Sequence, residues 1–286
     1  MGRARPFCSE LSRDVDEPLS ATASRIDHWL LVEYRGLWAP NALRGSGLSD
    51  QVKARLREQL RAREHTRLLF VRRPDRRGKP ELLAYAASSL VGGESVRRFA
   101  FEEYDDLRTV DLISGGAPVD HPLFLVCTHG KHDPCCARYG RPLFEALAEQ
   151  LEDEWVWQTT HVGGDRFAGN VVCLPHGLYY GRVAREDAVR LVDEHFAGRL
   201  LLDRYRGRSV YPFPVQAVEQ SVRADENLDA IDELQLRGVD GRRVAFAERG
   251  GTVHERVVEE TPGEPRFLTC NAKEERRPPR YSVRPS

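Results

Sequence analysis

Three of the six cysteines in the chain lie within ten residues, in the segment CTHGKHDPCC at positions 127–136. A short apolar run at 123–126 precedes this segment and predicts a strand that ends where the cysteines begin. Because α/β folds place ligand sites at the carboxyl ends of strands, this position favours a functional site. The spacing from Cys127 to Cys136 does not fit a compact zinc knuckle or a thioredoxin-type C-x-x-C dithiol. It fits a loop that wraps an iron–sulfur cluster, whose normal protein ligands are thiolates.

A second segment, HVGGDRFAGN at 161–170, has the composition of a tight ligand-binding loop. Its three glycines allow positive φ angles and a close approach of the backbone to a bound group. His161 and Asp165 flank the double glycine, so we expect the loop to aim both side chains at one metal. Inward-facing N–H groups in such a loop can donate hydrogen bonds to cluster sulfides.

The composition is that of an ordinary soluble protein, with 41% hydrophobic and 30% charged residues among 286. The net charge of −1 provides no basic field, so neither nucleic acid nor a membrane surface is expected as a partner. No stretch approaches the ~20 apolar residues of a membrane-spanning helix, and the first residues lack the apolar region of a signal peptide. We therefore expect a cytoplasmic protein. In that reducing compartment, clustered cysteines indicate metal or redox chemistry.

The hydrophobic pattern predicts an α/β fold made of two units. The first has strands at 29–34, 68–71, 82–87 and 96–101, a helix at 49–63 and a turn at 74–79. The second has strands at 123–126, 155–159, 171–174 and 178–183, with helices at 140–153 and 184–196. Residues 1–26 look irregular, 102–119 look like a linker, and the region from 222 ends in a small β-meander. The order of elements in the second unit is that of a thioredoxin-like layer.

These elements predict three regions: an N-terminal α/β domain (1–115), a thioredoxin-like domain carrying the metal site (120–221) and a small α+β extension (222–286). The two larger units also resemble each other. Asp27-His28 precedes the first strand of one unit, and Asp120-His121 precedes the first strand of the other. We therefore expect the N-terminal domain to be a degenerate thioredoxin-like copy that lacks the metal ligands.

The two site segments, together with LPHGLYYGRV at 174–183, resemble the sucrase/ferredoxin-like family. The resemblance covers most of the chain, from Thr22-Ala23 to Thr269-Cys270. Members of this family resemble thioredoxin-like ferredoxins and carry a C-x-H-x-x-x-D-x-x-C loop and an H-x-G-G-H loop. The resemblance implies a [2Fe–2S] cluster bound by two cysteines and two histidines, and an electron carrier that serves a redox partner which the sequence does not identify.

The family pattern places Cys127, Cys136 and His161 among the cluster ligands. The position of the second histidine is occupied by Asp165, which leaves the fourth ligand open. Asp165 can bind iron through its carboxylate, or the position can pass to Cys135, His129 or His132. The two extra histidines are otherwise expected to order the loop through hydrogen bonds.

The remaining candidates have plainer interpretations. Cys173 alternates with apolar residues in a strand and is expected in the core, while Cys8 and Cys270 have no paired signature. An alternative function is a thiol-based redox enzyme or a metal–thiolate sensor that uses Cys127, Cys135 and Cys136. Glycoside hydrolysis requires two carboxylates around a sugar site, and no such pair is evident. The pattern favours an electron carrier over a catalyst, so no catalytic residue is assigned.

Overall fold

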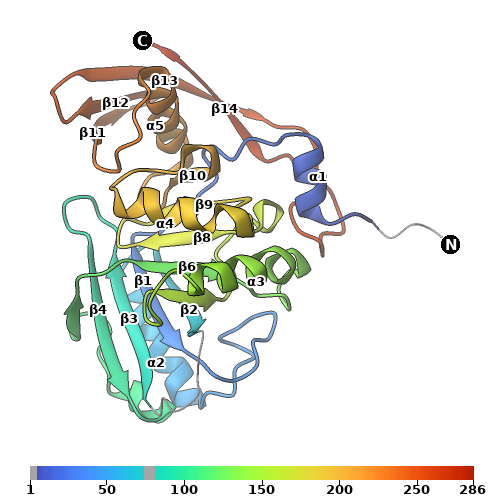
Figure 1. Ribbon diagram of the computed structural model, residues 1–286, viewed down its shortest axis with the longest axis vertical. Coiled ribbons are helices and arrows are strands. Elements are labelled where there is room, and N and C mark those ends of the chain that lie inside the picture. Colours follow the sequence, from blue (N-terminus) through green and yellow to red (C-terminus); the bar gives the residue numbers. More distant parts are fainter. Residues whose placement is uncertain (1–4, 74–80) are drawn as a thin grey trace.

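The computed structural model describes residues 5–73 and 81–286 of the chain. The turn expected at 74–79 lies outside these residues. The largest element of the fold is a ten-stranded mixed sheet with the spatial order β10-β9-β8-β6-β7-β2-β1-β3-β4-β5 (Figure 1). Its strands are β1 (His28–Glu33), β2 (Thr66–Arg72), β3 (Leu82–Ser88), β4 (Ser95–Phe101), β5 (Ala117–Val119), β6 (Leu123–Cys127), β7 (Val156–Thr159), β8 (Val171–Leu174), β9 (Leu178–Tyr180) and β10 (Tyr205–Arg208).

The two halves of this sheet have the same topology. In the first half β1 is parallel to β2 and antiparallel to β3, which pairs antiparallel with β4. In the second half β6 is parallel to β7 and antiparallel to β8, which pairs antiparallel with β9. Each half thus has the strand order of a thioredoxin-like layer, as the repeat predicts. The halves join through a short antiparallel contact between β2 and β7, so both belong to one sheet.

Helices cover the outer faces of the two halves. The helix α2 (Asp50–Arg61) packs Val52 and Leu56 against the first half. The helices α3 (Pro134–Ala148) and α4 (Ala188–Phe196) pack against the second half. The opposite faces of both halves share one core, in which Trp29 of β1 meets Tyr179 of β9 with ring centroids 6.1 Å apart. Because four strands separate β1 from β9 in the sheet, this contact shows that the sheet curls around its core.

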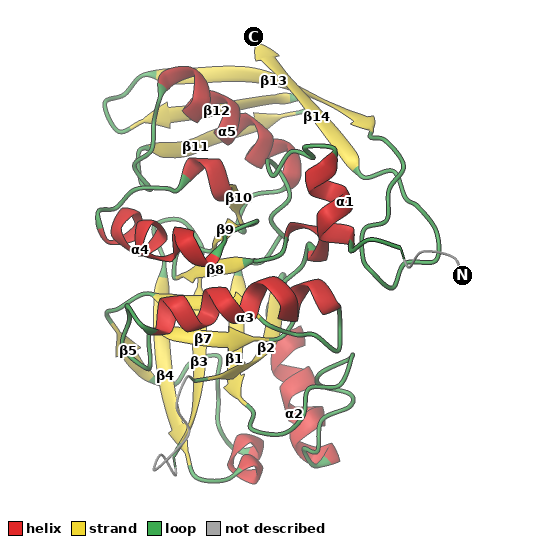
Figure 2. Ribbon diagram, turned by 45° about the vertical axis from the view of Figure 1, so that its right-hand side comes forward, coloured by secondary structure: helices red, strands yellow, loops and turns green. Residues whose placement is uncertain are grey.

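The two ends of the chain add a smaller layer, which Figure 2 shows above the main sheet. The helix α5 (Phe213–Glu226) packs on a four-stranded antiparallel sheet. Its strands are β11 (Leu234–Asp240), β12 (Arg243–Glu248), β13 (Val253–Pro262) and β14 (Pro279–Pro285). The short helix α1 (Cys8–Asp14) lies beside the segment that connects β13 to β14 in both views.

Several sequence predictions of local structure were wrong. The helix predicted to begin at residue 140 begins at Pro134, because Asp133 caps it and accepts a hydrogen bond from the Cys135 N–H at 2.9 Å. The stretch taken as a linker contains β5 and a 3₁₀ helix, Tyr104–Arg108. The N-terminal segment expected to be irregular contains α1. The strands β10 and β14 were not expected.

Among the described residues, we find no helix with the length and apolar character needed to cross a membrane.

Candidate metal centre

The two site segments meet because β6 and β7 are parallel neighbours. The strand β6 ends at Cys127 and β7 ends at Thr159, so both following segments leave the same edge of the sheet. The first segment turns directly into α3, whose first turn holds Cys135 and Cys136. The second segment contains His161 and reverses direction at Gly163 and Gly164, which have φ angles of +107° and +78°. A positive φ favours glycine, which explains the double glycine of the sequence.

The predicted ligands converge in this corner of the fold. The ligand atoms of Cys127, Cys136 and His161 all lie within 4.8 Å of one another. Asp165 adjoins this group, with its Oδ1 atom 3.3 Å from the Cys136 Sγ and 2.8 Å from the His161 Nδ1. The ligand atoms of Asp165, His161 and His132 form a second set within 4.8 Å of one another. The two thiols and the carboxylate are buried, whereas a quarter of the His161 side chain is exposed.

The charges of these groups depend on one another. The hydrogen bond to the Cys136 thiol, aided by His161, lowers the pKa of Cys127 well below its usual range despite burial. The same bond, together with burial and the Asp165 charge, raises the pKa of Cys136. Burial opposes protonation of His161, but hydrogen bonds to Asp165 and Cys127 outweigh it and raise its pKa to about 9. Cys127 is therefore the more acidic of the two thiols.

The other two histidines of the segment differ in their contacts. His129 is occupied by the backbone: its Nε2 lies 2.9 Å from the Ala39 carbonyl, and its Nδ1 accepts from the His161 N–H at 3.4 Å. It orders the loop, as expected. His132 stacks on His161 with ring centroids 3.9 Å apart, and its Nε2 lies 3.7 Å from the Asp165 Oδ2. Its Nδ1 faces the Pro40 carbonyl at 3.3 Å, which leaves Nε2 directed at the site.

Cys135 does not join this group. Its Sγ lies 3.6 Å from that of Cys8 and 3.3 Å from that of Cys270, so the thiol faces a different cluster. The thiol-redox alternative combines Cys135 with Cys127 and Cys136, whereas the thiols that Cys135 contacts in the structure are Cys8 and Cys270. Cys173 is buried in the core, as predicted from its alternating pattern.

A buried arginine that the sequence did not single out supports the His161 loop. Arg206 of β10 donates to the Gly163 carbonyl at 3.0 Å and to the Asn170 Oδ1 at 2.8 Å. It also lies over the ring of Phe167, 5.0 Å from the centroid. A Cβ atom at Gly164 would lie 2.4 Å from the guanidinium, so the double glycine also makes room for Arg206. An arginine in a strand carries no sequence signal for this role, because these partners, a backbone carbonyl and the Asn170 side chain, belong to a distant loop.

The donor set is chemically suited to an iron–sulfur cluster. Two thiolates supply the soft, anionic ligands that iron–sulfur centres need, and imidazole or carboxylate completes the set. Cys136 lies in the first turn of α3, where the helix dipole favours a negative charge. The surrounding walls are apolar and include Leu125 and Val162.

Comparisons with known proteins identify related sequences and structures. A family model described as sucrase/ferredoxin-like matches residues 19–207. Altered inheritance of mitochondria protein 32 from Meyerozyma guilliermondii is 38% identical over 95 residues, which cover 30% of this chain and 34% of that protein. The protein of the same name from Debaryomyces hansenii is 33% identical over 95 residues, which cover 30% of this chain and 35% of that protein. The matched region thus spans about a third of these curated relatives.

Among solved structures, a thioredoxin-like [2Fe–2S] ferredoxin from Aquifex aeolicus is similar to this chain, with 21% sequence identity and a TM-score of 0.30. That match covers 33% of this chain and 97% of the ferredoxin. The strand order and the convergent cysteines define a thioredoxin-like α/β protein with a Cys-rich candidate metal site. Since the family model matches well over half of the 286 residues, the chain belongs to the sucrase/ferredoxin-like family.

Proposed function

We propose that this protein is an electron carrier that holds a [2Fe–2S] cluster through Cys127, Cys136, His161 and Asp165. The observation that carries the proposal is the convergence of two buried thiols, one imidazole and one carboxylate at the carboxyl ends of two parallel strands. A cluster of this type, when bound, accepts and releases single electrons. The chain's own part is to supply the ligands, orient them and limit the access of water.

The fourth ligand is assigned to Asp165 because of its position. Its side chain is only 2% exposed and contacts both Cys136 and His161, so its charge is held inside the site. His132 is the other group that can reach the same place, through Nε2. In our proposal His132 is not a ligand, and its Nε2 faces the Oδ2 atom of Asp165.

The exposed edge of the site suggests where electrons pass. His161 and His132 line a surface hollow together with His129 and the apolar side chains of Ala42 and Leu43. The side chains of His161 and His132 are 25% and 35% exposed, whereas both ligand thiols are buried. A redox partner that docks over this hollow would contact the imidazoles and not the sulfur atoms. We propose a protein partner of this kind, in the cytoplasm, where the thiols stay reduced.

An absorption spectrum of anaerobically purified protein tests the function. A broad visible band that bleaches with dithionite, followed by an electron paramagnetic resonance signal from the reduced protein, is the expected result. A protein that stays colourless after anaerobic reconstitution with iron and sulfide would overturn the proposal.

A further inference from the structure

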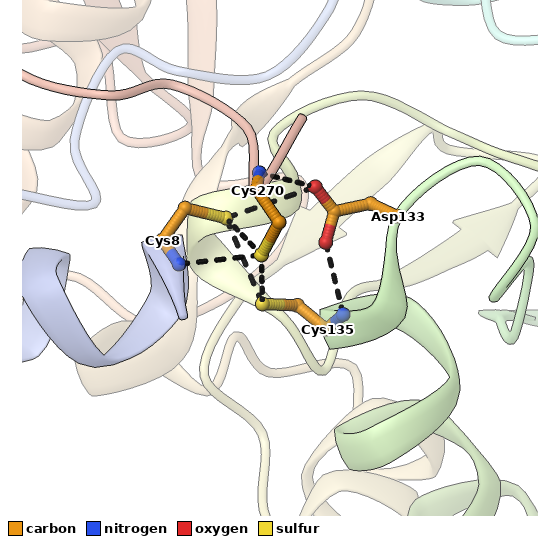
Figure 3. Close-up of side chains that lie close together, drawn as sticks. All are labelled: Cys8, Asp133, Cys135 and Cys270. Atoms are coloured by element: carbon orange, nitrogen blue, oxygen red, sulfur yellow. Dashed lines mark hydrogen bonds between the residues drawn. The ribbon is translucent and has the colours of Figure 1, made fainter. Parts of the chain in front are cut away.

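A second set of thiols lies outside the proposed cluster site. Cys8 begins α1, Cys135 lies in the first turn of α3, and Cys270 lies in the segment between β13 and β14. Figure 3 shows the three side chains pointing toward one another from these three segments. Their Sγ atoms are 3.6 Å (Cys8 to Cys135), 3.3 Å (Cys135 to Cys270) and 3.5 Å (Cys270 to Cys8) apart.

Asp133 occupies the fourth side of this group. Its carboxylate is fully buried, and its Oδ2 lies 3.9 Å from the Cys8 Sγ. Each oxygen already accepts one backbone hydrogen bond, from the Cys135 N–H at 2.9 Å and from the Cys270 N–H at 2.7 Å. A carboxylate oxygen has a second lone pair, so these bonds orient Asp133 and leave it able to bind a cation. One ligand atom from each of the four residues lies within 4.8 Å of the others.

We propose that Cys8, Cys135, Cys270 and Asp133 bind one Zn²⁺ ion in a structural site. Zinc bonds to sulfur are about 2.3 Å long, so the sulfur atoms of a tetrahedral site lie about 3.8 Å apart. The three separations in this protein are slightly shorter, and side-chain rotations are enough to open them. A disulfide would join only two of the three sulfurs, whereas zinc uses all of them together with the carboxylate.

Hydrogen-bond donors face two of the three sulfur atoms. The Ser9 hydroxyl donates to the Cys135 Sγ at 3.1 Å, and the Cys8 N–H donates to the Cys270 Sγ at 3.4 Å. Hydrogen bonds to the charged form stabilise a thiolate. Phe7 and Tyr139 pack against the group and shield it from water. Three thiolates and a carboxylate would carry four negative charges in a buried place, and a divalent cation offsets half of them.

The proposed zinc site ties together parts of the chain that are far apart in sequence. Cys8 and Cys270 are 262 residues apart and both meet the start of α3. The ion would therefore hold the N-terminal helix and the C-terminal segment against the helix that also presents Cys136. Binding energy of a structural zinc is folding energy, so its loss should loosen both ends of the chain. This inference does not rest on the electron-transfer proposal, because it uses none of the proposed cluster ligands.

Elemental analysis of the full-length protein, purified anaerobically without chelators, tests the inference. We expect one zinc per chain in the wild type, and a loss of at least tenfold in Cys8→Ser and Cys270→Ser, with the visible spectrum retained. Cys173→Ser, which removes a buried core thiol, should keep its zinc. Cys127→Ser should lose iron and keep zinc, so failure of one site can be told from failure of the other.

Cobalt titration of the wild-type protein, after its zinc has been removed with a chelator, makes the test independent of the folding of the variants. Co²⁺ should give intense sulfur-to-metal charge-transfer bands and tetrahedral ligand-field bands, and one equivalent of Zn²⁺ should remove them. A wild-type protein that contains no zinc and binds neither ion overturns the proposal. So does zinc retained in both Cys8→Ser and Cys270→Ser, iron found in its place, or a disulfide between any two of the three cysteines in the anaerobic protein.

Discussion

Cys135 and Cys136 are consecutive residues, yet their thiols face different clusters. The Cys136 Sγ lies 3.3 Å from the Asp165 Oδ1, and the Cys135 Sγ lies 3.3 Å from the Cys270 Sγ. The helix α3 separates them, because neighbouring side chains on a helix point in different directions. A vicinal pair that suggests one dithiol in the sequence therefore faces two separate clusters of side chains in the fold.

The cysteine substitutions should separate ligands from bystanders. Cys127→Ser and Cys136→Ser should each reduce iron content at least tenfold, because a hydroxyl does not neutralise iron charge as a thiolate does. Cys173→Ser should retain the cluster, since that thiol lies in the core among apolar side chains. Iron and acid-labile sulfide assays on anaerobic preparations of the three variants measure how much cluster each one retains. Equal loss in all three variants would show that the ligands are misassigned.

Gly140 fixes the distance between α3 and the end of β6. A Cβ atom at this position would lie 2.0 Å from the Cys127 carbonyl oxygen, so Gly140→Ala must push the helix away from the ligand. We expect a loss of about 1–3 kcal/mol or more in unfolding free energy, together with lower iron content. Denaturant unfolding and an iron assay check this. Gly238→Ala is the matched control, because among the described residues no atom beyond the chain neighbours lies within 4 Å of its added Cβ. A similar loss there would refute the packing argument.

Site residues that lie close together in the sequence could be predicted, whereas contacts between residues far apart in the sequence could not. The residues Cys127, Cys136, His161 and Asp165 lie in two short segments after parallel strands, so local patterns locate them. Asp133-Pro134 is a helix start signal that the sequence contained, but we predicted the start at residue 140. The cluster of Cys8, Cys135 and Cys270 could not be predicted, because nothing in the spacing of residues 262 positions apart indicates contact.

The pairing that joins the two halves of the sheet could not be predicted from the sequence either. The contact between β2 and β7 consists of the pairs Val71–Thr159 and Arg72–Gln158. Edge strands offer unpaired backbone groups along their whole length. The side-chain pattern therefore does not reveal which two edge strands pair with each other. The predicted boundaries at 115 and 120 therefore fall within one sheet, and the division into separate domains stays a prediction.

His195 should make stability sensitive to acid. Burial, helped by the charge of His176, lowers the pKa of His195 to about 4, and its Nδ1 has no hydrogen-bond partner in the described structure. The unfolded chain binds this proton below its ordinary pKa of about 6.5, whereas the folded chain does not until about 4. Stability should therefore fall as the pH drops from 6.5 to 4, by about 3 kcal/mol.

Replacement of this histidine should remove that sensitivity. His195 packs edge-on against Phe124 with centroids 5.0 Å apart, so His195→Phe keeps an aromatic ring in the space. The difference between the denaturant midpoints at pH 7 and pH 4.5 should be smaller in the variant than in the wild type. Loss of metal in acid affects both proteins and cancels in the comparison. His65 is exposed, so His65→Gln provides a control that should keep the wild-type dependence of stability on pH. If His195→Phe also keeps that dependence, the acid sensitivity does not come from His195.

The reduction potential should report the carboxylate ligand. An oxidised [2Fe–2S] core has a formal charge of −2 with four thiolates and 0 with two thiolates and two neutral histidines. One histidine and one carboxylate give −1, so the potential should lie between the two classes. These lie near −400 mV for plant-type centres and at roughly −150 to +300 mV for two-histidine centres. Protein-film voltammetry of the wild type measures the value.

Asp165→His converts this ligand set to the two-histidine type and should raise the potential, because adding an electron to a neutral site costs less. It should also widen the range of pH over which the potential changes, since a second imidazole can take up a proton on reduction. The carboxylate, with a reference pKa of about 3.9, does not do so near neutral pH. In the wild type the slope should not exceed about 59 mV per pH unit, the value for one proton per electron. If Asp165→His changes neither the potential nor its pH range while His132→Ala changes both, then His132 is the fourth ligand and Asp165 only positions it.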